Sequence, residues 1–200
     1  KGLAKGERSI CNWDEDTITM AVEATTDCLS ALTEANVSSL KLASTTLPFL
    51  DRQNSVVIAE ALSLDRAIST MDFSASQRAA TSALINCLES NRNGNQLLVA
   101  SEHRRTKAGS RAEMLWGDAA AAVAIGDDDV IAQCLGVATH AVDFIDHYRG
   151  DGADFDYDWE ERWIRDEGFM KIVPTVVESV LDDAGVAAAD IKHFILPTDQ

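Results

Sequence analysis

The sequence predicts an α/β protein built on a mainly parallel, layered sheet. Short apolar runs typical of buried strands alternate along the chain with segments in which apolar residues recur at helical spacing. This alternation favours a parallel sheet whose strands are joined by right-handed helical crossovers. Hydrophobic residues make up 46% of the 200 positions, which is enough for the core of one large domain or two small ones.

A helix, a strand and a second helix are predicted first. The acidic run at residues 14–16 supplies an N-cap and first-turn acids for a helix that continues to about Leu32. Residues 38–43 alternate like a short strand and lead into a polar loop that contains Pro48. A wide apolar face predicts the second helix over residues 51–62.

The centre of the predicted fold is the stretch from residue 68 to residue 89. Residues 68–73 predict a buried strand, residues 74–76 a turn of small side chains, and a largely apolar helix is expected to begin near Gln77. A helix N-terminus leaves backbone N–H groups unpaired and carries a partial positive charge. The arrangement therefore favours a bound thiolate, oxyanion or phosphate, although Gln77 itself is neither a nucleophile nor a base.

Two further strands complete the first part of the chain. Residues 96–100 predict a buried strand, which is followed by a polar loop over residues 101–111. The alanine-rich run over residues 119–127 suits a strand packed closely against helices on both of its faces. A turn at residues 126–129 marks the expected boundary between two half-domains.

The pattern changes after this turn. Residues 130–141 predict a long strand, and residues 147–168 predict a loop dense in acidic and aromatic side chains. A helix is expected over residues 169–184, with Pro174 in its first turns, and a last strand over residues 193–196.

Charge and cysteine spacing exclude several classes of function. A net charge of −16, from 33 acidic and 17 basic residues, argues against binding to nucleic acid or to an anionic membrane surface. The four cysteines show no zinc-site or disulfide spacing, which fits a reducing cytosol and predicts a cytoplasmic protein. His140 and His147 flank Asp143 and Asp146 in irregular sequence and are interpreted as ordinary polar residues, so no metal is expected. No apolar run reaches the length of a membrane span.

Four segments, taken in order, carry a family resemblance. They are residues 13–21 (WDEDTITMA), 72–84 (DFSASQRAATSAL), 116–121 (WGDAAA) and 190–197 (DIKHFILP). Together they resemble the thiolase superfamily of condensing enzymes, in the branch that contains HMG-CoA synthase and ketoacyl-ACP synthase III. The resemblance implies a thiolase-like α/β/α/β/α sandwich of two similar halves, with mainly parallel sheets and one antiparallel-type strand. Residues 1–128 would form the first half without its opening strand, and residues 129–200 would begin the second half.

The resemblance also assigns the family's catalytic positions to this chain. The nucleophilic Cys falls on Gln77, which cannot be acylated, and the neighbouring Ser76 would be the nucleophile only if the alignment shifted by one. The catalytic His falls on Thr198, because Pro197 matches the proline before it, and the catalytic acid falls on Thr45. Neither Thr is a plausible general base at neutral pH. At all three catalytic positions, therefore, the residue differs from the one that the family carries.

Two further segments are candidates for binding. The basic cluster of Arg104, Arg105 and Lys107, together with His103, either clamps a CoA phosphate or forms a solvated loop. The aromatic side chains of residues 154–163 would cost solubility if exposed, so we expect them to cover an acyl pocket or a subunit interface. Asp118 is expected to make a structural hydrogen bond in a tight turn.

The resemblance implies a protein that handles acyl thioesters of CoA or of an acyl carrier protein, with no other cofactor. Gln at the Cys position favours a non-acylated subunit of a condensing or acyltransferase complex. The chain would form a homodimer, or a heteromer with a second thiolase-like subunit and a zinc-ribbon/OB-fold partner, with residues 68–73 close to the interface.

Two alternatives remain open at this point. One is an active acyl-CoA condensing enzyme, of HMG-CoA synthase or ketoacyl synthase type, with a displaced nucleophile. The other is a thiolase-fold lyase or decarboxylase without a catalytic Cys, in which Tyr148 or Tyr157 donates a proton.

Overall fold

The structure, a computed structural model, describes residues 7–33, 36–90 and 94–197. The chain divides into two units, which are described separately below. The first comprises Lys1–Arg104 and Met114–Ile131, and the second comprises Arg105–Glu113 and Ala132–Gln200. The short helix α4 (Arg111–Leu115) belongs partly to each. Among the helices in the described ranges, none is both long enough and apolar enough to cross a membrane.

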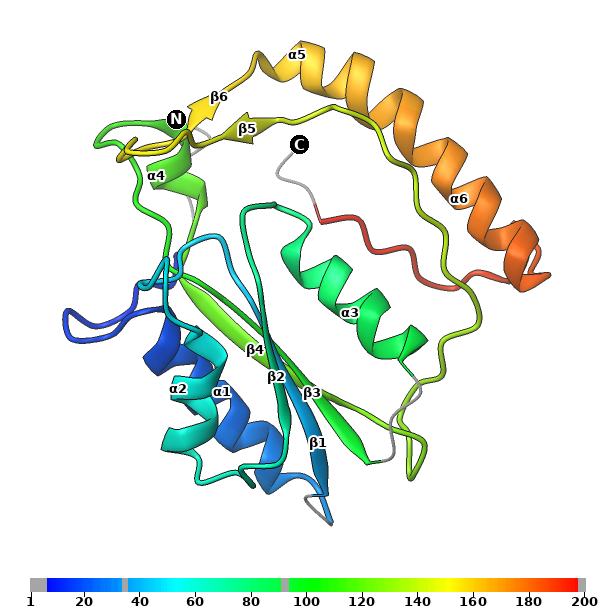
Figure 1. Ribbon diagram of the computed structural model, residues 1–200. Helices are drawn as coiled ribbons and strands as arrows, with labels where there is room; N and C mark the ends of the chain where they lie inside the picture. The colour runs from blue at the N-terminus through cyan, green and yellow to red at the C-terminus, as the bar shows by residue number, and fades with distance from the viewer. Residues whose placement is uncertain (1–6, 34–35, 91–93, 198–200) are drawn as a thin grey trace. The chain divides into compact units, whose positions relative to one another are not determined.

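The first unit is built on a four-stranded sheet with strand order β2-β1-β3-β4 (Figure 1). The central strand β1 (Val37–Ala43) pairs in parallel with β2 (Ser69–Phe73) on one side and with β3 (Asn95–Glu102) on the other. β4 (Ala119–Ile125) runs antiparallel to β3. This mixed, mostly parallel sheet confirms the predicted α/β class.

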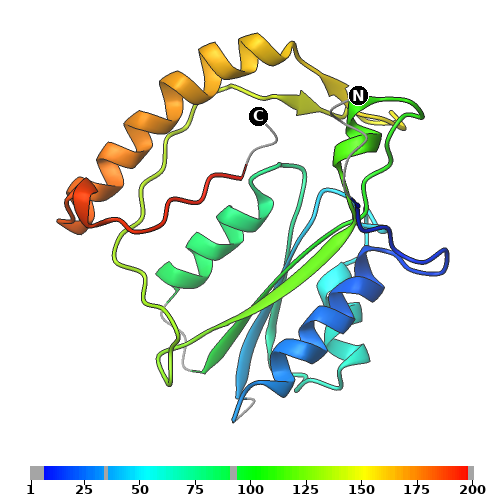
Figure 2. The same ribbon diagram turned by 180° about the vertical axis from the view of Figure 1, so that it is seen from behind.

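Helices cover both faces of this sheet (Figures 1 and 2). α1 (Thr17–Ser30) and α2 (Asn54–Ala61) pack on one face, and α3 (Ala79–Glu89) packs on the other. The core under α1 and α2 consists of Ile18, Ala21, Leu40, Leu42, Ile58, Leu97 and Val99. The core under α3 consists mainly of small side chains, namely Ala43, Ala79, Ala83 and Cys87, with Leu98.

The start of α1 agrees with the sequence prediction because the acidic run supplies its cap. The side chain of Asp16 accepts hydrogen bonds from the backbone N–H groups of Ile18 at 2.8 Å and Thr19 at 2.9 Å. In return, the Asp16 backbone N–H donates to the Thr19 hydroxyl at 2.8 Å. This capping box satisfies N–H groups that the first turn of a helix cannot pair internally.

Three details of the first unit differ from the prediction. The strand over residues 68–73 is present as β2, but it is only half-buried because it lies at the edge of the sheet, where Met71 is 39% exposed. β4 is also an edge strand, and alternate side chains along it are exposed, so its expected burial between helices on both faces is wrong. α3 begins at Ala79, two residues after the predicted start near Gln77.

The second unit contains a hairpin, a long helix in three parts and a final turn. These elements are β5 (His147–Tyr148), β6 (Tyr157–Asp158), α5 (Glu161–Trp163), the π-helical η1 (Ile164–Phe169), α6 (Met170–Ala184) and the 3-10 turn η2 (Ala188–Asp190). Pro174 lies inside α6 and has no N–H to donate to the preceding turn, and the irregular η1 lies directly before that turn. Gly185 ends α6 in the left-handed conformation, with a φ of 64°.

The sequence predictions for this unit are partly wrong. Residues 130–141 and 193–196 are not strands, because a strand is stabilised by hydrogen bonds to a neighbouring strand and no described strand pairs with either segment. Residues 147–168, predicted as a loop, contain the β5–β6 hairpin and the first part of the helix. Aromatic residues of this segment contact one another, since the ring centroid of Trp159 lies 5.1 Å from that of Trp163 and 6.0 Å from that of Tyr157. Trp163 also stacks on Phe144, which precedes the segment, with ring centroids 4.5 Å apart.

Candidate functional site

The carboxyl ends of the three parallel strands lie along one side of the sheet, together with the start of β4 (Figure 1). We call this side the carboxyl edge of the sheet, as distinct from its outer strands. Several residues singled out in the sequence lie in the loops at this edge, namely Thr45 after β1, Ser76 and Gln77 after β2, and Arg104 after β3. The first two loops are joined by a hydrogen bond of 3.0 Å from the Ser44 N–H to the Phe73 carbonyl. Because ligands of open α/β sheets bind at this edge, it is the candidate site.

The turn between β2 and α3 presents Ser76 and Gln77 at the surface. The Ser76 hydroxyl accepts a hydrogen bond from the Arg78 N–H at 3.1 Å, and the Ser76 carbonyl accepts one from the Ala79 N–H at 2.9 Å. Ala75 has a φ of 59°, in the left-handed region that few residues other than glycine adopt. The turn therefore engages the Ser76 hydroxyl in its own backbone and leaves Gln77 exposed two residues ahead of α3.

Thr45 lies in a network of polar side chains formed with Thr46, Glu102 and Arg104. The Glu102 carboxylate accepts hydrogen bonds from the Thr45 N–H at 2.6 Å, from the Thr45 hydroxyl at 3.1 Å and from the Thr46 hydroxyl at 2.9 Å. Arg104 donates to the Thr45 hydroxyl, and its guanidinium lies over the ring of Trp116. We call these four residues the Thr45–Glu102 network, which holds a carboxylate directly against Thr45.

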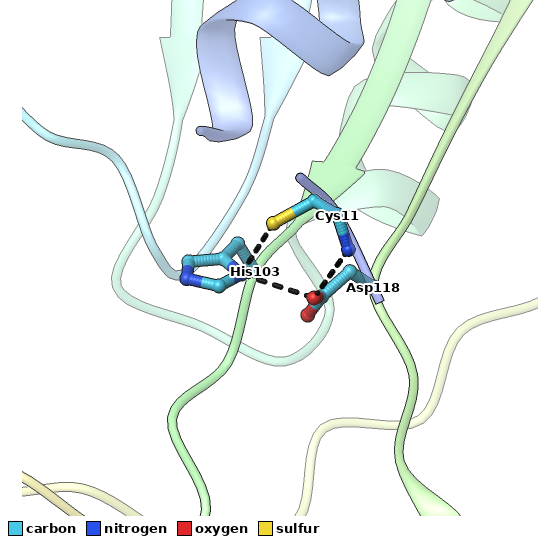
Figure 3. A group of neighbouring side chains, drawn as sticks. All are labelled: Cys11, His103 and Asp118. Atoms are coloured by element: carbon cyan, nitrogen blue, oxygen red, sulfur yellow. Dashed lines mark hydrogen bonds and ion pairs between the residues drawn. The ribbon is translucent and has the colours of Figure 1, made fainter. Parts of the chain in front are cut away.

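A second cluster at the same edge consists of Cys11, His103 and Asp118 (Figure 3). The His103 Nδ1 atom lies 3.2 Å from the Cys11 Sγ atom and 3.2 Å from an Asp118 carboxylate oxygen. The Cys11 backbone N–H donates to the same carboxylate at 3.0 Å, so Asp118 makes a structural hydrogen bond, but to a segment 107 residues away and not within the tight turn that the sequence predicted. The clusters are linked, because the His103 N–H donates to the Thr46 hydroxyl at 3.0 Å.

A close approach of two backbone segments brings Cys11 to Asp118. The Asp118 N–H donates to the Ser9 carbonyl at 2.9 Å, and the Ser9 hydroxyl donates to the Asp118 carbonyl at 2.6 Å. A Cβ atom on Gly117 would lie only 2.9 Å from the Ser9 carbonyl oxygen, so only glycine permits this approach. The segment ahead of α1 is thereby fixed beside the start of β4.

The pKa of Cys11 is raised, whereas the pKa of Asp118 is lowered. Burial and the neighbouring Asp118 carboxylate raise the pKa of the Cys11 thiol above its ordinary value. Burial alone would raise the pKa of Asp118 too, but hydrogen bonds from Cys11 and His103 outweigh it and lower this pKa. As it stands, the cluster thus favours a thiol beside an ionised carboxylate and not a reactive thiolate.

Comparisons with known proteins now give this geometry a context. No protein-family model matches the sequence. Among curated proteins, the hydroxymethylglutaryl-CoA synthase of Caldivirga maquilingensis is 23% identical over 194 residues, which are 94% of this chain and 55% of that protein. The chain is a distant relative of hydroxymethylglutaryl-CoA synthase.

Solved structures show the same relationship at the level of the fold. An HMG-CoA synthase complexed with CoA matches with a TM-score of 0.81 at 18% identity, covering 96% of this chain and 50% of that one. The 3-oxoacyl-(acyl carrier protein) synthase III of Pseudomonas aeruginosa PAO1 matches with a TM-score of 0.73 at 21% identity, covering 90% of this chain and 60% of that one. The chain spans about half the length of the hydroxymethylglutaryl-CoA synthases that it matches, so the expected pair of similar halves is not seen.

The remaining positions suggested by the resemblance to hydroxymethylglutaryl-CoA synthase are Thr198 and the basic cluster after β3. Thr198 lies outside the described residues. Arg105 and Lys107 are exposed and belong to the second unit, whereas Arg104 belongs to the first and contacts Thr45 and Trp116. A phosphate clamp formed by the three basic residues stays a prediction.

The sequence analysis missed Glu102 and the Cys11 cluster. Glu102 fell in the polar loop predicted over residues 101–111, whereas in the structure it is the last residue of β3, and its closeness to the carboxyl end of a predicted strand was a usable signal. Cys11 is separated from His103 by 92 residues and from Asp118 by 107, so no local spacing rule connects them.

Proposed function

We propose that this chain handles acyl thioesters, carried on CoA or on an acyl carrier protein, as a non-acylated subunit of a condensing or acyltransferase complex. The observation that carries the proposal is Gln77, an exposed amide just ahead of α3 at the position where the family resemblance places the nucleophilic Cys. An amide side chain cannot form the acyl-enzyme thioester. MvaS, a solved structure with a similar fold, is in complex with 3-hydroxy-3-methylglutaryl coenzyme A, which supports a thioester as the ligand class.

The N-terminus of α3 supports binding of a thioester without covalent attachment. The N-cap residue, Arg78, makes no capping hydrogen bond with its side chain. A helix start of this kind favours a carbonyl oxygen or a carboxylate, because its N–H groups and its dipole both attract negative charge. The Gln77 amide is able to donate a further hydrogen bond to such a group.

A partner subunit would supply the nucleophile that this chain lacks. β2 is an edge strand in the described sheet, and an edge strand offers unpaired backbone groups to another chain. This supports pairing through residues 68–73, either with a second copy or with a different thiolase-like subunit. A zinc-ribbon/OB-fold partner remains part of the proposal by family resemblance alone.

A second candidate function is that of a lyase or decarboxylase without a catalytic Cys. The observation that favours it is the Glu102 carboxylate, which contacts Thr45 at the position of the family's catalytic acid and so offers a base or proton carrier there. Tyr148 and Tyr157, the proposed proton donors, face each other across the β5–β6 hairpin with ring centroids 5.5 Å apart.

The displaced-nucleophile alternative receives less support. The Ser76 hydroxyl is engaged by the backbone of its own turn, and the raised pKa of Cys11 disfavours a thiolate there. The Ser76 hydroxyl therefore lacks the adjacent base that an acyl-accepting nucleophile requires.

Incubation with radiolabelled acetyl-CoA tests the proposal. We expect no acid-stable label on the purified chain, while an active HMG-CoA synthase treated in parallel becomes labelled. Label that maps to Ser76 or to a cysteine would contradict the proposal and identify the nucleophile. In an unlabelled sample, co-purification of a thiolase-like subunit favours the first function, and slow turnover of a malonyl-type or β-hydroxyacyl thioester favours the second.

A further inference from the structure

We propose that Cys11, His103 and Asp118 form a binding site for a zinc-type divalent cation, separate from the thioester chemistry proposed above. The three side chains come from the segment ahead of α1, the loop after β3 and the turn before β4, all within the first unit (Figure 3). Each offers one ligand atom, and the three atoms lie within 4.8 Å of one another.

The position of the His103 Nδ1 atom is the main geometric argument. This one atom faces both the Cys11 Sγ and an Asp118 carboxylate oxygen, at 3.2 Å in each case. Two ligand atoms of a tetrahedral zinc ion lie roughly 3.4–3.6 Å apart, given the usual metal–ligand bond lengths. The two 3.2 Å separations fall short of this spacing by a few tenths of an ångström, and the third pair lies within 4.8 Å, so a small adjustment of the side chains would admit the ion.

A nucleophilic triad would need a different geometry. In a triad, one imidazole nitrogen faces the nucleophile while the other is held by the carboxylate, so that a proton can be passed across the ring. In this cluster the same nitrogen faces both groups. A thiolate, an imidazole and a carboxylate that converge from three directions are instead a donor set that suits zinc.

The surroundings of the cluster fit a metal site with an open position. The His103 side chain is 41% exposed and that of Asp118 is 11% exposed, so the ion and a fourth, solvent ligand can enter from one side. Backbone contacts orient the ligands, because the Cys11 N–H donates to Asp118 and the His103 N–H donates to the Thr46 hydroxyl. Such supporting hydrogen bonds are typical of metal centres.

Cobalt titration of the full chain, after removal of metal by a chelator, tests this site. We expect one Co²⁺ per chain, a thiolate-to-cobalt charge-transfer band, displacement by Zn²⁺ and a higher melting temperature with Zn²⁺. Cys11→Ser should abolish the charge-transfer band, and both Cys11→Ser and His103→Gln should weaken binding at least about tenfold. The matched control is Cys134→Ser, because Cys134 is the exposed cysteine of the second unit and should leave binding unchanged.

Before titration, the circular dichroism spectrum of each variant is compared with that of the wild type, and only variants with an unchanged spectrum are used. The proposal is overturned if the wild-type chain binds no cobalt with thiolate character, or if folded Cys11→Ser and His103→Gln bind as tightly as the wild type. No acyl-CoA is present in this experiment, so its result is independent of the acylation test.

Discussion

α2 and α3 begin at the same edge of the sheet, but their N-termini differ in how they are capped. The start of α2 is closed by Asp72 of β2, whose carboxylate accepts hydrogen bonds from the backbone N–H groups of Asn54 at 2.6 Å and Ser55 at 2.8 Å. At α3, the N-cap residue Arg78 makes no such bond with its side chain, and the residues before it are exposed.

Because of this difference, the backbone arrangement at the start of α3 and the chemistry of the side chain that precedes it have to be considered separately. A glutamine precedes each helix, since Gln53 is the N-cap of α2 and Gln77 lies two residues ahead of α3. At α2 the Asp72 carboxylate offsets the positive end of the helix dipole, whereas at α3 the N–H groups of Arg78 and Ala79 donate to neutral groups of Ser76, which leave the dipole uncompensated by charge. The fold thus retains an anion-stabilising helix start where the family resemblance places the nucleophile, although the side chain there is an amide.

The largest expected effect comes from placing a thiol ahead of each helix. Gln77→Cys should give a cysteine whose pKa is about one unit or more below that of Gln53→Cys, because a carboxylate closes the start of α2 while neutral groups of Ser76 pair with the start of α3. Gln77→Cys should also accept label from acetyl-CoA, while Gln53→Cys stays unlabelled. The rate of alkylation as a function of pH measures each thiol pKa.

Equal reactivity of the two thiols would contradict the claim that the starts of α2 and α3 differ in how they stabilise negative charge. Ser76→Cys is a further control, because it places a thiol in the same turn but one position early. If Ser76→Cys is acylated and Gln77→Cys is not, the alignment is shifted by one residue and Gln77 is not the position of the nucleophile.

A smaller effect, on the free energy of unfolding, is expected when the Asp72 carboxylate at the start of α2 is removed. Burial alone would raise the pKa of Asp72, but hydrogen bonds from Ser55 and Asn54 outweigh it and lower this pKa below the usual value of 3.8. Asp72→Asn should therefore reduce the free energy of unfolding by about 1–2 kcal/mol at neutral pH, as measured by urea denaturation.

The pH dependence of Asp72 has a definite sign. Because the pKa is lower in the folded state, the stabilisation is fully present above the usual value of 3.8 and is lost as the pH falls through the lowered folded-state pKa. The stability difference between wild type and Asp72→Asn should thus shrink as the solution is acidified. A difference that stays constant down to strongly acidic pH would contradict this role.

The smallest effect is expected at the turn ahead of α3. Ser76→Ala removes one exposed hydrogen bond to the Arg78 N–H and should cost no more than about 1 kcal/mol of unfolding free energy. Thioester binding should be unchanged, and the variant should stay unacylated like the wild type. A loss of thioester binding in a variant of unchanged stability would show that Ser76 itself contacts the ligand.

The sequence predicted those parts of the fold that depend on local interactions. The Asp16 cap of α1, the parallel strands and α3 follow from side-chain capping and apolar periodicity. Residues 130–141 and 193–196 have the composition of strands, but a strand requires a pairing partner that composition does not reveal. The exposed face of β4 was missed for a similar reason, since coverage by a helix is a tertiary property.

The candidate site was predictable only where one segment carries it. The turn that contains Ser76 and Gln77 lies between adjacent elements, so the alternation of strand and helix indicated its place. The contact of Glu102 with Thr45 spans 57 residues, and the Cys11 cluster depends on Gly117 allowing two distant segments to approach. Such contacts depend on the folded sheet and leave no local pattern.

The most direct test of the central claim is the fate of the Ser76–Gln77 turn when the wild-type chain is exposed to acetyl-CoA. Mass spectrometry of the intact chain, and of the peptide that contains this turn, measures acylation without any substitution. We expect the mass of both to remain unchanged while Gln77→Cys gains one acetyl group. An acetyl group on the wild-type chain, bound through Ser76 or through a cysteine, would contradict the assignment as a non-acylated subunit.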